Sequence, residues 1–534
     1  MRWVFIALVC LGNACTCFHA QRSDEHGRSK VESTQPLRLV VVLVVDQLRG
    51  DELRVHDKLL RFGLRRLISE GRWYTQAMHG HLRTETAAGH ATIATGLYPR
   101  YHGVVDKQVY DVKRREVVGV CEFGASPNVP DVLLAETLGD RLKNVQPAAV
   151  VVAMAQKDRS AMLLGGHHAD LVTWFDFDRT ELRSRQAGGG PLPVWLRRSF
   201  EQNATPERMS HLWELPRLPP PYSTWVDDQP GELDSGFGRT FPHRLGDAKE
   251  RRTFYRRWFT TPDSDRAVLD MAANALRPMG MGQDDVPDVL LVSLGAFDLI
   301  GHTFGPDSLE HIAALVELDR ALGDFLHALE EQVNGGVLLA LTSDHGVAPL
   351  VSIARQRGLI SGRVDLAALA STLEETLGQQ FGPGPHIEIL SFPFLRLMPA
   401  ASAQLHDKQV AAAIAALKDY PGVAAAYATA PYLTDSAPPT DPMEKLLYNN
   451  ICPQRSGDIV IVLEPYHEPL SRFGDEGSGH GSPWEYDRHV PVVLWGNGIR
   501  HARIDQEVAV IDMTRTLEAR LGVAADPRGG VMLP

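Results

Sequence analysis

The chain has 534 residues, of which 44% are hydrophobic and 22% are charged, so it is long enough to fold around a large core. Its formal net charge is -12, which excludes a general nucleic-acid or anionic-membrane binder, because such surfaces need clustered Lys and Arg. An anionic substrate would therefore need a local cationic site, such as a bound metal ion.

The first 20 residues have the pattern of a secretory signal peptide. Arg2 precedes the apolar run WVFIALVCLG, and the small residues NAC follow it. This run is too short to span a bilayer and no other run is long enough, so we expect an exported, periplasmic or secreted protein without a transmembrane segment. Cleavage after Ala14 would leave Cys15 as a candidate lipid anchor, although Gly12 stands where a lipobox usually has Leu.

Two cysteines, Cys121 and Cys452, lie outside this N-terminal segment. In an exported protein they could form a disulfide that closes a very long loop. Two free buried thiols are an equally weighted alternative, and the sequence leaves both open.

Apolar runs that end in polar residues recur along the chain. The run LRLVVVLVVD, residues 37 to 46, is rich in β-branched residues and ends at Asp46, which is typical of a strand buried on both faces of a parallel sheet. PAAVVVAMAQKDR, PDVLLVSLGAFD and GGVLLALTSDH repeat the pattern, with helical spacing between them. The sequence therefore predicts an α/β fold with a doubly wound, mostly parallel sheet flanked by helices, and a ligand site beyond the carboxyl ends of the strands.

Two regions interrupt this alternation. Residues 214 to 245 are rich in Pro, Gly and Asp and predict an irregular surface excursion. Residues 386 to 465 contain HIEILSFPFLRL, QVAAAIAALKDY and SGDIVIVLEP, which predict a smaller inserted α+β cap. We therefore expect one main domain over residues 37 to 534, with the cap inserted at 386 to 465.

Aspartates and histidines stand at the predicted strand ends and in the segment GSGHGSPWEYDRHVPVVLWG. Alone, an Asp at a strand end is more often a cap or turn residue, but the fold should bring these separated segments to one edge. Three carboxylates and three imidazoles are enough for two divalent ions, each with an open position. The candidate ligands are Asp46, Asp298, His302, Asp344, His345 and His480.

Thr86 opens the segment TAAGHATIATG and has two interpretations. As a helix N-cap, its hydroxyl would accept a hydrogen bond from a backbone amide. As a nucleophile, it would need a metal ion to become an alkoxide, and a helix N-terminus would help to stabilise that charge. We predict that Thr86 is both the helix N-cap and the nucleophile. No comparable argument for metal binding applies to Thr84 or Thr95.

Five segments occur in a family-specific order: VVDQLRGD, TAAGHATIATGLYPRYHG, DLIGHTFGPDS, TSDHG and HGSPWEYDRHVPVVLWG. With them the chain resembles the alkaline phosphatase superfamily, specifically the type I phosphodiesterase/nucleotide pyrophosphatase group with a threonine nucleophile. The resemblance implies two Zn²⁺ ions per chain and a phosphothreonine intermediate; such ions, about 4 Å apart, activate the nucleophile and neutralise the leaving oxygen. The implied ligands are Asp46, Thr86, Asp344 and His345 for one ion, and Asp298, His302 and His480 for the other.

Lys157 and Arg159 bear on whether the substrate is a monoester or a diester. A monoester carries one more anionic oxygen, so its hydrolysis gains from additional cations. In an extended segment the two side chains would lie on one side, and KDR here resembles the PafA-type alkaline phosphatases, whose Lys and Arg contact the transferred phosphate. The resemblance thus favours an alkaline phosphatase acting on phosphate monoesters. A phosphodiesterase or nucleotide pyrophosphatase with the same metals is the alternative, and a non-catalytic binding protein is a third.

The segment VVDKQVYD departs from the resemblance. Related enzymes commonly have an Asn after YHG that donates to a phosphate oxygen, whereas this chain has Lys107 there, followed by Gln108. We predict that Lys107 binds the substrate as a further cation; the alternatives are that the contact is lost or that Gln108 makes it. The remaining candidate histidines are predicted to be structural: His90 would brace the helix of Thr86, His102 would pack nearby, and the segment with His167 and His168 would orient the Lys157 loop.

Overall fold

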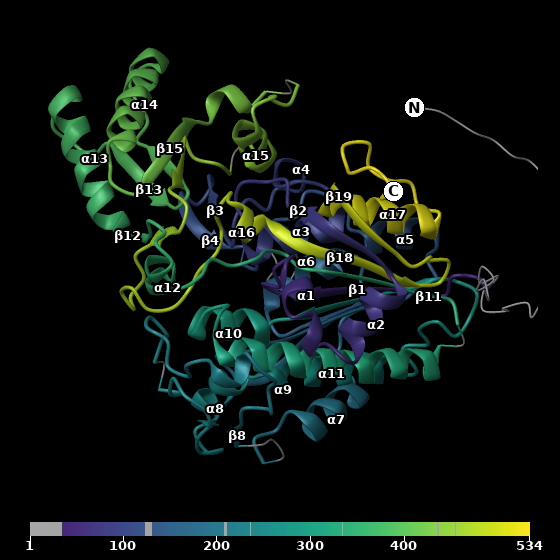
Figure 1. Ribbon diagram of the computed structural model, residues 1–534. Helices are drawn as coiled ribbons and strands as arrows, with labels where there is room; N and C mark the ends of the chain where they lie inside the picture. The colour runs from purple at the N-terminus through teal and green to yellow at the C-terminus, as the bar shows by residue number, and fades with distance from the viewer. Residues whose placement is uncertain are drawn as a thin grey trace, which may run out of the picture. The chain divides into compact units, whose positions relative to one another are not determined.

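The strand that ends before Asp46 lies in the middle of a large sheet (Figure 1). This strand, β1 (Leu39–Val45), is buried along its whole length. It pairs in parallel with β10 (Asp288–Leu294) on one side and with β11 (Val337–Thr342) on the other. Beyond β10, the parallel pairing continues to β5 (Val151–Ala155) and β6 (Leu171–Asp176).

The computed structural model describes residues 35–122, 131–207, 211–234, 236–333, 335–434, 437–453 and 455–534. Over these residues the large sheet has nine strands in the order β19-β2-β18-β11-β1-β10-β5-β6-β7. Only β18 and β7 run against their neighbours, which confirms the predicted mostly parallel sheet. The predicted signal peptide and Cys15 lie outside the described residues. The outer strands are β2 (Arg72–Met78), β7 (Glu181–Gln186), β18 (His489–Gly496) and β19 (Ala502–Ala509).

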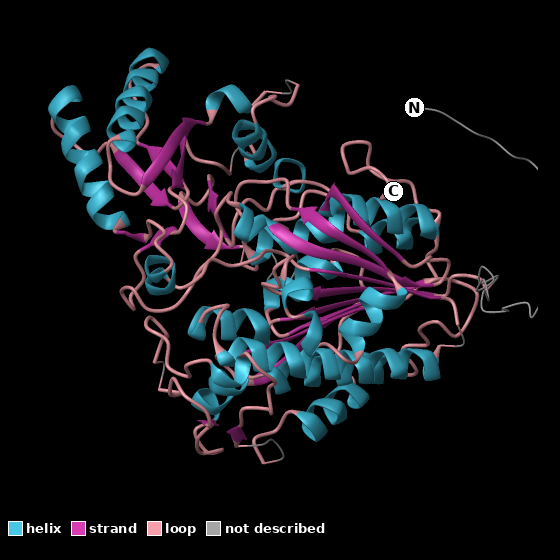
Figure 2. Cartoon of the chain, in the orientation of Figure 1, coloured by secondary structure: helices cyan, strands magenta, loops and turns pink. Residues whose placement is uncertain are grey.

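Helices cover both faces of this sheet (Figures 1 and 2). Alternate residues of β1 point to opposite faces, so that Leu43 joins one apolar cluster and Val42 joins the other. Each such fully buried side chain stabilises the fold by about 1.5–3 kcal/mol. On the Leu43 face lie α2 (Gly63–Glu70), α7 (Val194–Asn203), α8 (Arg251–Trp258), α9 (Pro262–Ala275), α10 (Ala296–Phe304) and α11 (Leu309–Gln332), and on the Val42 face lie α3 (Thr86–Thr95), α5 (Leu138–Val145), α6 (Asp158–Gly165) and α17 (Val510–Leu521).

A second, antiparallel sheet lies in the later part of the chain. In the described residues it has the order β13-β14-β16-β15, and α13 (Leu366–Phe381) and α14 (Ala403–Lys418) pack on it through their own apolar cluster. All four strands fall within residues 386 to 465, although α13, which packs on them, lies wholly before residue 386. The assignment of 386 to 465 as an inserted cap stays a prediction. The strands are β13 (Ile387–Ser391), β14 (Phe394–Leu397), β15 (Val423–Ala428) and β16 (Ile459–Leu463).

The remaining elements are short. Among the described residues of 214 to 245, only the three-residue turn Tyr222–Thr224 and the short strand β9 (His243–Arg244) are regular, which agrees with the predicted irregular excursion. The other elements are α1 (Glu52–Val55), η1 (Asp57–Leu59), α4 (Pro99–His102), β3 (Gln108–Asp111), β4 (Glu116–Gly119), β8 (Leu212–Trp213), β9 (His243–Arg244), α12 (Val351–Gln356), β12 (Gly362–Val364), η3 (Ala430–Tyr432), α15 (Pro442–Asn450), β17 (His467–Pro469) and α16 (Glu485–Arg488).

Cys121 and Cys452 both lie in the described part of the chain. Cys121 and Cys452 are both free thiols that contact one apolar cluster, so the disulfide alternative is wrong; Cys452 is buried as the free-thiol alternative expects, whereas Cys121 is only half-buried. Within the described part of the chain, no helix combines the length and the hydropathy needed to cross a membrane.

Candidate metal centre at the carboxyl ends of the strands

The predicted Asp and His residues converge at one edge of the large sheet. Asp46 directly follows β1, and Asp344 with His345 follows the neighbouring β11. Asp298 and His302 lie on α10, which follows β10 on the other side of β1. His480 comes from the loop between β17 and α16. The strand-end arrangement inferred from the sequence thus brings these separated segments together.

Asp46, Asp344 and His345 form a first group, in which the donor atoms all lie within 4.8 Å of one another. His345 Nε2 is 3.4 Å from Asp46 Oδ1 and 3.4 Å from Asp344 Oδ2, and all three residues are fully buried. Asp46 Oδ1 accepts no hydrogen bond from any described residue. A buried carboxylate oxygen without a donor, beside an imidazole and a second carboxylate, fits a divalent cation.

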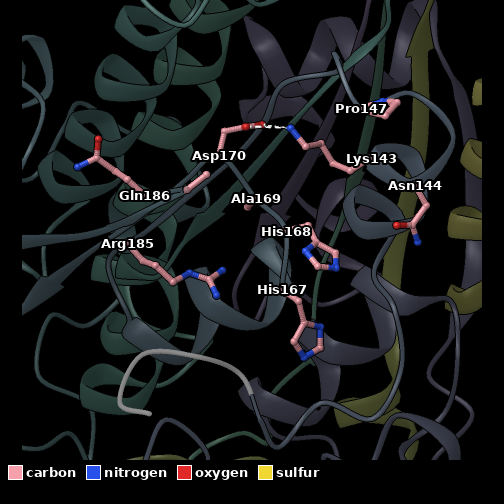
Figure 3. Close-up of a pocket in the computed structure, with 10 residues that line it drawn as sticks. Lys143, Asn144, Pro147, His167, His168, Ala169, Asp170, Arg185 and Gln186 are labelled. Atoms are coloured by element: carbon pink, nitrogen blue, oxygen red, sulfur yellow. Dashed lines mark hydrogen bonds and ion pairs between the residues drawn. The ribbon is translucent and has the colours of Figure 1, made fainter. Parts of the chain in front are cut away.

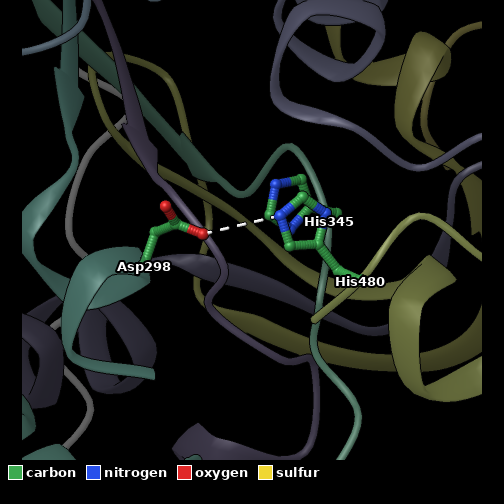
Figure 4. Close-up of side chains that lie close together, drawn as sticks. All are labelled: Asp298, His345 and His480. Carbon is green, nitrogen blue, oxygen red and sulfur yellow. Dashed lines mark ion pairs between the residues drawn. The ribbon is translucent and has the colours of Figure 1, made fainter. Parts of the chain in front are cut away.

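Asp298, His345 and His480 form a second group, also with donor atoms within 4.8 Å (Figure 4). His480 Nε2 is 3.7 Å from Asp298 Oδ1, and the rings of His480 and His345 stack with centroids 3.6 Å apart. His302 Nε2 faces the same Asp298 oxygen at 3.2 Å, but His302 is outside this group. His345 therefore belongs to both groups and joins them.

Burial and charge shift the protonation of these groups in opposite directions. Burial, followed by repulsion from Asp298 and Asp344, raises the pKa of Asp46 to about 7. Burial also opposes ionisation of Asp298, but the charges of His302 and Lys157 hold its pKa well below the usual value. Burial and the neighbouring His345 push the pKa of His480 well below its usual value, so this imidazole is neutral, the form that ligates metal.

Lys157 lies between the two groups. Its Nζ donates to Asp46 Oδ2 at 2.5 Å and to Asp298 Oδ2 at 2.6 Å, so one buried ammonium is shared between a carboxylate of each group. Lys157 is the N-cap of α6, and Arg159 lies half-buried in the first turn of that helix. The premise that Lys157 and Arg159 share one side of an extended segment is therefore wrong, because the helix begins between them.

Thr86 faces the first group. It is 2% exposed, and its Oγ1 lies 3.5 Å from His345 Nε2. Thr86 is already the first helical residue of α3, while Glu85 occupies the N-cap and its side chain accepts no capping hydrogen bond. The prediction that Thr86 also caps the helix is therefore wrong: its hydroxyl points to the metal group rather than to a backbone amide.

Gly89 and His90 explain the sequence AAGHA behind Thr86. A Cβ at Gly89 would lie 2.4 Å from the Asp344 backbone oxygen, so only glycine lets α3 approach that loop so closely. His90 Nδ1 is 2.8 Å from the Thr86 carbonyl and 3.2 Å from Asp344 Oδ2, while His90 Nε2 is 2.8 Å from Ser293 Oγ. His90 thus braces the helix of Thr86 against Asp344 and β10, as predicted.

Arg83 connects three loops around the centre, and sequence patterns did not single it out. Its side chain is buried and donates to Asp106 Oδ2 at 2.8 Å, to Glu85 Oε1 at 2.7 Å and to the Gly481 carbonyl at 2.8 Å. It thereby joins the segment before Thr86 to the loop of His480. The only sequence signal was an arginine close to the candidate nucleophile, which by itself indicates nothing about burial.

Lys107 approaches the same network from the surface. Its side chain is 53% exposed, and its Nζ lies 3.6 Å from Glu85 Oε1. Glu85 directly precedes Thr86, so the structure brings Lys107 beside the segment of the candidate nucleophile. Gln108 is exposed at the start of β3.

The other candidate histidines lie away from the two groups. His102 Nε2 is 3.0 Å from Thr92 Oγ1, a structural contact. His167 and His168 follow the C-terminus of α6 and line a cavity of about 450 Å³ with Lys143, Asp170 and Arg185 (Figure 3). Both histidines follow the C-terminus of α6, whereas Lys157 caps its N-terminus, so the imidazoles themselves do not orient Lys157.

The segment HHADLVTWFDFD, which begins with His167 and His168, does contact the loop of Lys157, but through its later residues at the end of β6. The Phe175 backbone N–H donates to the Gln156 carbonyl at 3.1 Å, next to Lys157.

Comparison with known proteins agrees with this geometry. Residues 40–489 match the sequence model of the type I phosphodiesterase / nucleotide pyrophosphatase family, and the chain belongs to this family. It is 31% identical to alkaline phosphatase PhoD of Zymomonas mobilis, over 91% of this chain and 85% of that protein. It is 28% identical to alkaline phosphatase PafA of Elizabethkingia meningoseptica, over 95% of both chains. A crystal structure of PafA matches with a TM-score of 0.84 at 26% identity, over 94% of this chain and 99% of that one. The resemblance to the alkaline phosphatase superfamily and to PafA is thereby confirmed.

The close approach at Gly89 gives a first prediction. Gly89→Ala should destabilise the protein by about 1–3 kcal/mol, because the new methyl group overlaps the Asp344 backbone. Gly378→Ala is the matched control: this glycine lies in α13 with open space around its Cβ, and alanine should stabilise it by about 0.5–1 kcal/mol. Denaturant unfolding measures both, and equal effects would contradict the close packing of α3 on Asp344.

The Arg83 network gives a second prediction. Arg83→Lys should cost about 3–5 kcal/mol of unfolding free energy, because an ammonium cannot bond Asp106, Glu85 and Gly481 together and leaves a buried carboxylate unpaired. Arg66→Lys, in a half-exposed pair with Glu70 on α2, should change it by less than about 1 kcal/mol. Thermal and urea unfolding would show the difference, and a loss below about 1 kcal/mol at Arg83 would refute its role as a connector.

Proposed function

We propose that this protein is a metal-dependent alkaline phosphatase that hydrolyses phosphate monoesters through Thr86. The observation that carries the proposal is the Thr86 hydroxyl at the start of α3, facing the group of Asp46, Asp344 and His345. Similarity over nearly the whole chain to proteins named alkaline phosphatases supports it. The family also includes phosphodiesterases, so a diester substrate on the same centre is the second candidate.

The donor set fits two Zn²⁺ ions, which prefer imidazole and carboxylate ligands in such sites. When bound, the ions supply Lewis-acid catalysis: they stabilise an ionised hydroxyl and a leaving oxygen at neutral pH. The proposed ligands are Asp46, Thr86, Asp344 and His345 for one ion, and Asp298, His302 and His480 for the other.

Residues of the chain itself would hold and transfer the phosphoryl group. Thr86 Oγ1 attacks phosphorus, the bond to the leaving alcohol breaks, and water then displaces Thr86 to release inorganic phosphate. The backbone amides at the N-terminus of α3 face the incoming anion and favour its negative charge. Lys157 donates hydrogen bonds to a carboxylate of each group. The proposed cations for the remaining phosphate oxygens are Lys157, Arg159 and Lys107.

We also propose that residues 1 to 20 direct export, with Cys15 as a candidate lipid anchor, and that the enzyme acts in the periplasm or outside the cell. The charged residue, apolar run and small residues at the N-terminus support this proposal. An extracytoplasmic phosphatase would release phosphate from small esters that are not taken up intact.

Loss of the nucleophile gives the third prediction. Thr86→Ala should lower kcat for p-nitrophenyl phosphate by roughly 10³-fold or more, because no other hydroxyl would replace the attacking oxygen. Thr95→Ala, in the same helix, should keep kcat within about threefold per folded molecule, since its hydroxyl donates to the Ala91 carbonyl and accepts from the Leu97 N–H rather than facing the candidate ligands. Peptide mass spectrometry of acid-quenched wild-type enzyme should find phosphate on Thr86. An active Thr86→Ala enzyme would refute the proposed role.

The cations give the fourth prediction. Arg159→Ala and Lys157→Met should lower kcat/KM for p-nitrophenyl phosphate by roughly 10²–10³-fold, and that for bis-p-nitrophenyl phosphate by much less, because only the monoester carries the additional charge. Arg179→Ala, at an exposed arginine, is the control. If the wild-type enzyme strongly prefers the diester, the proposed monoesterase is wrong and the phosphodiesterase is the better assignment.

A further inference from the structure

Gln47, the residue after Asp46, has a backbone conformation that is unusual for its side chain. Its φ is +72°, in the left-handed region, and the residue is fully buried. Glycine or asparagine enters this region more readily, so a glutamine here carries a conformational cost. A strained, buried residue beside a functional group is a reason to ask what its side chain does.

Gln47 contacts both groups of candidate ligands. Its backbone N–H donates to Asp344 Oδ1 at 3.2 Å, in the first group. Its side-chain Nε2 donates to Asp298 Oδ1 at 2.8 Å, in the second group. The left-handed turn directs the backbone amide to one carboxylate while the side chain reaches the other. One residue therefore spans the centre and holds an aspartate of each group.

The surroundings of Gln47 fix the position of its amide. A Cβ at Gly301 of α10 would lie 1.7 Å from Gln47 Oε1, so the glutamine occupies the space that a side chain at Gly301 would need. Gly301 lies between Asp298 and His302 in sequence, on the helix that carries both. The Nε2 must face Asp298 in this pocket, because the reversed amide would set Oε1 against the carboxylate oxygen.

We propose that Gln47 is a positioning residue that orients Asp298 and couples it to the group of Asp344. The inference rests on the proposed function only in that the two groups hold metal ions. Residues that hydrogen-bond metal ligands from outside typically change metal affinity by about 10–100-fold when removed. The two contacts of Gln47 differ in kind: every substitution except proline keeps the backbone donor to Asp344, whereas most remove the side-chain donor to Asp298. The effect should therefore fall on one metal position rather than on both.

Two variants separate this role from general stability. Gln47→Met keeps the length of the side chain and removes its donor. Gln47→Asn tolerates the left-handed backbone better, but its amide is one methylene too short to reach Asp298. Gln76→Met, an exposed glutamine on β2, is the matched control for the chemical change. Unfolding midpoints identify any variant that fails to fold. If Gln47→Met fails to fold, the proposed role is tested on Gln47→Asn.

The experiment is a zinc titration of the full-length enzyme in metal-buffered solutions, with bound zinc measured by mass spectrometry rather than by activity. We expect one of the two zinc positions in Gln47→Met and Gln47→Asn to fill only at about 10–100-fold higher free zinc, while the other changes by less than about twofold. Equal shifts at both positions, or none, would overturn the inference while leaving the proposed function intact. A wild-type chain that binds fewer than two zinc ions would contradict both.

Discussion

Three buried aspartates at one edge of a parallel sheet impose the main physical constraint on this molecule. Asp46, Asp298 and Asp344 follow the three adjacent central strands, and all are buried. Negative charges so close together and away from water repel one another strongly, so cations among them, or a proton on Asp46, stabilise the centre. Lys157 supplies part of that positive charge from the chain itself. Divalent ions would supply the remaining positive charge. They would thereby stabilise the cluster of aspartates and make it able to catalyse a reaction.

The residues that support this centre act mainly through its ligands. Gly89 lets α3 lie against the Asp344 loop, which brings Thr86 to His345. Arg83 joins the segment before Thr86 to the loop that carries His480. These contacts link loops that are far apart in sequence, so a change in one of them should move the nucleophile and the ligands together. Phosphoryl transfer depends on such positioning more than on any special reactivity of a side chain.

Much of the fold and of the ligand set could be predicted because both depend on local patterns. The β-branched run before Asp46 predicts a buried parallel strand. The carboxyl end of that strand predicts the edge of the sheet where the ligands lie. The errors concern one-residue geometry: Thr86 is inside its helix rather than at the cap, and Arg159 is helical rather than extended. The role of Arg83 depends on partners up to 398 residues away, and no single-sequence pattern predicts such contacts.

The most direct test of the account is to follow phosphatase activity as zinc is added back to metal-free enzyme, with bound zinc counted in each sample. If two ions neutralise the aspartates and prepare Thr86, hydrolysis of p-nitrophenyl phosphate should stay near zero until the second equivalent binds, and should reach its plateau at two zinc ions per chain. Full activity in a chain that holds no metal, or a plateau at well below two ions per chain, would contradict the account.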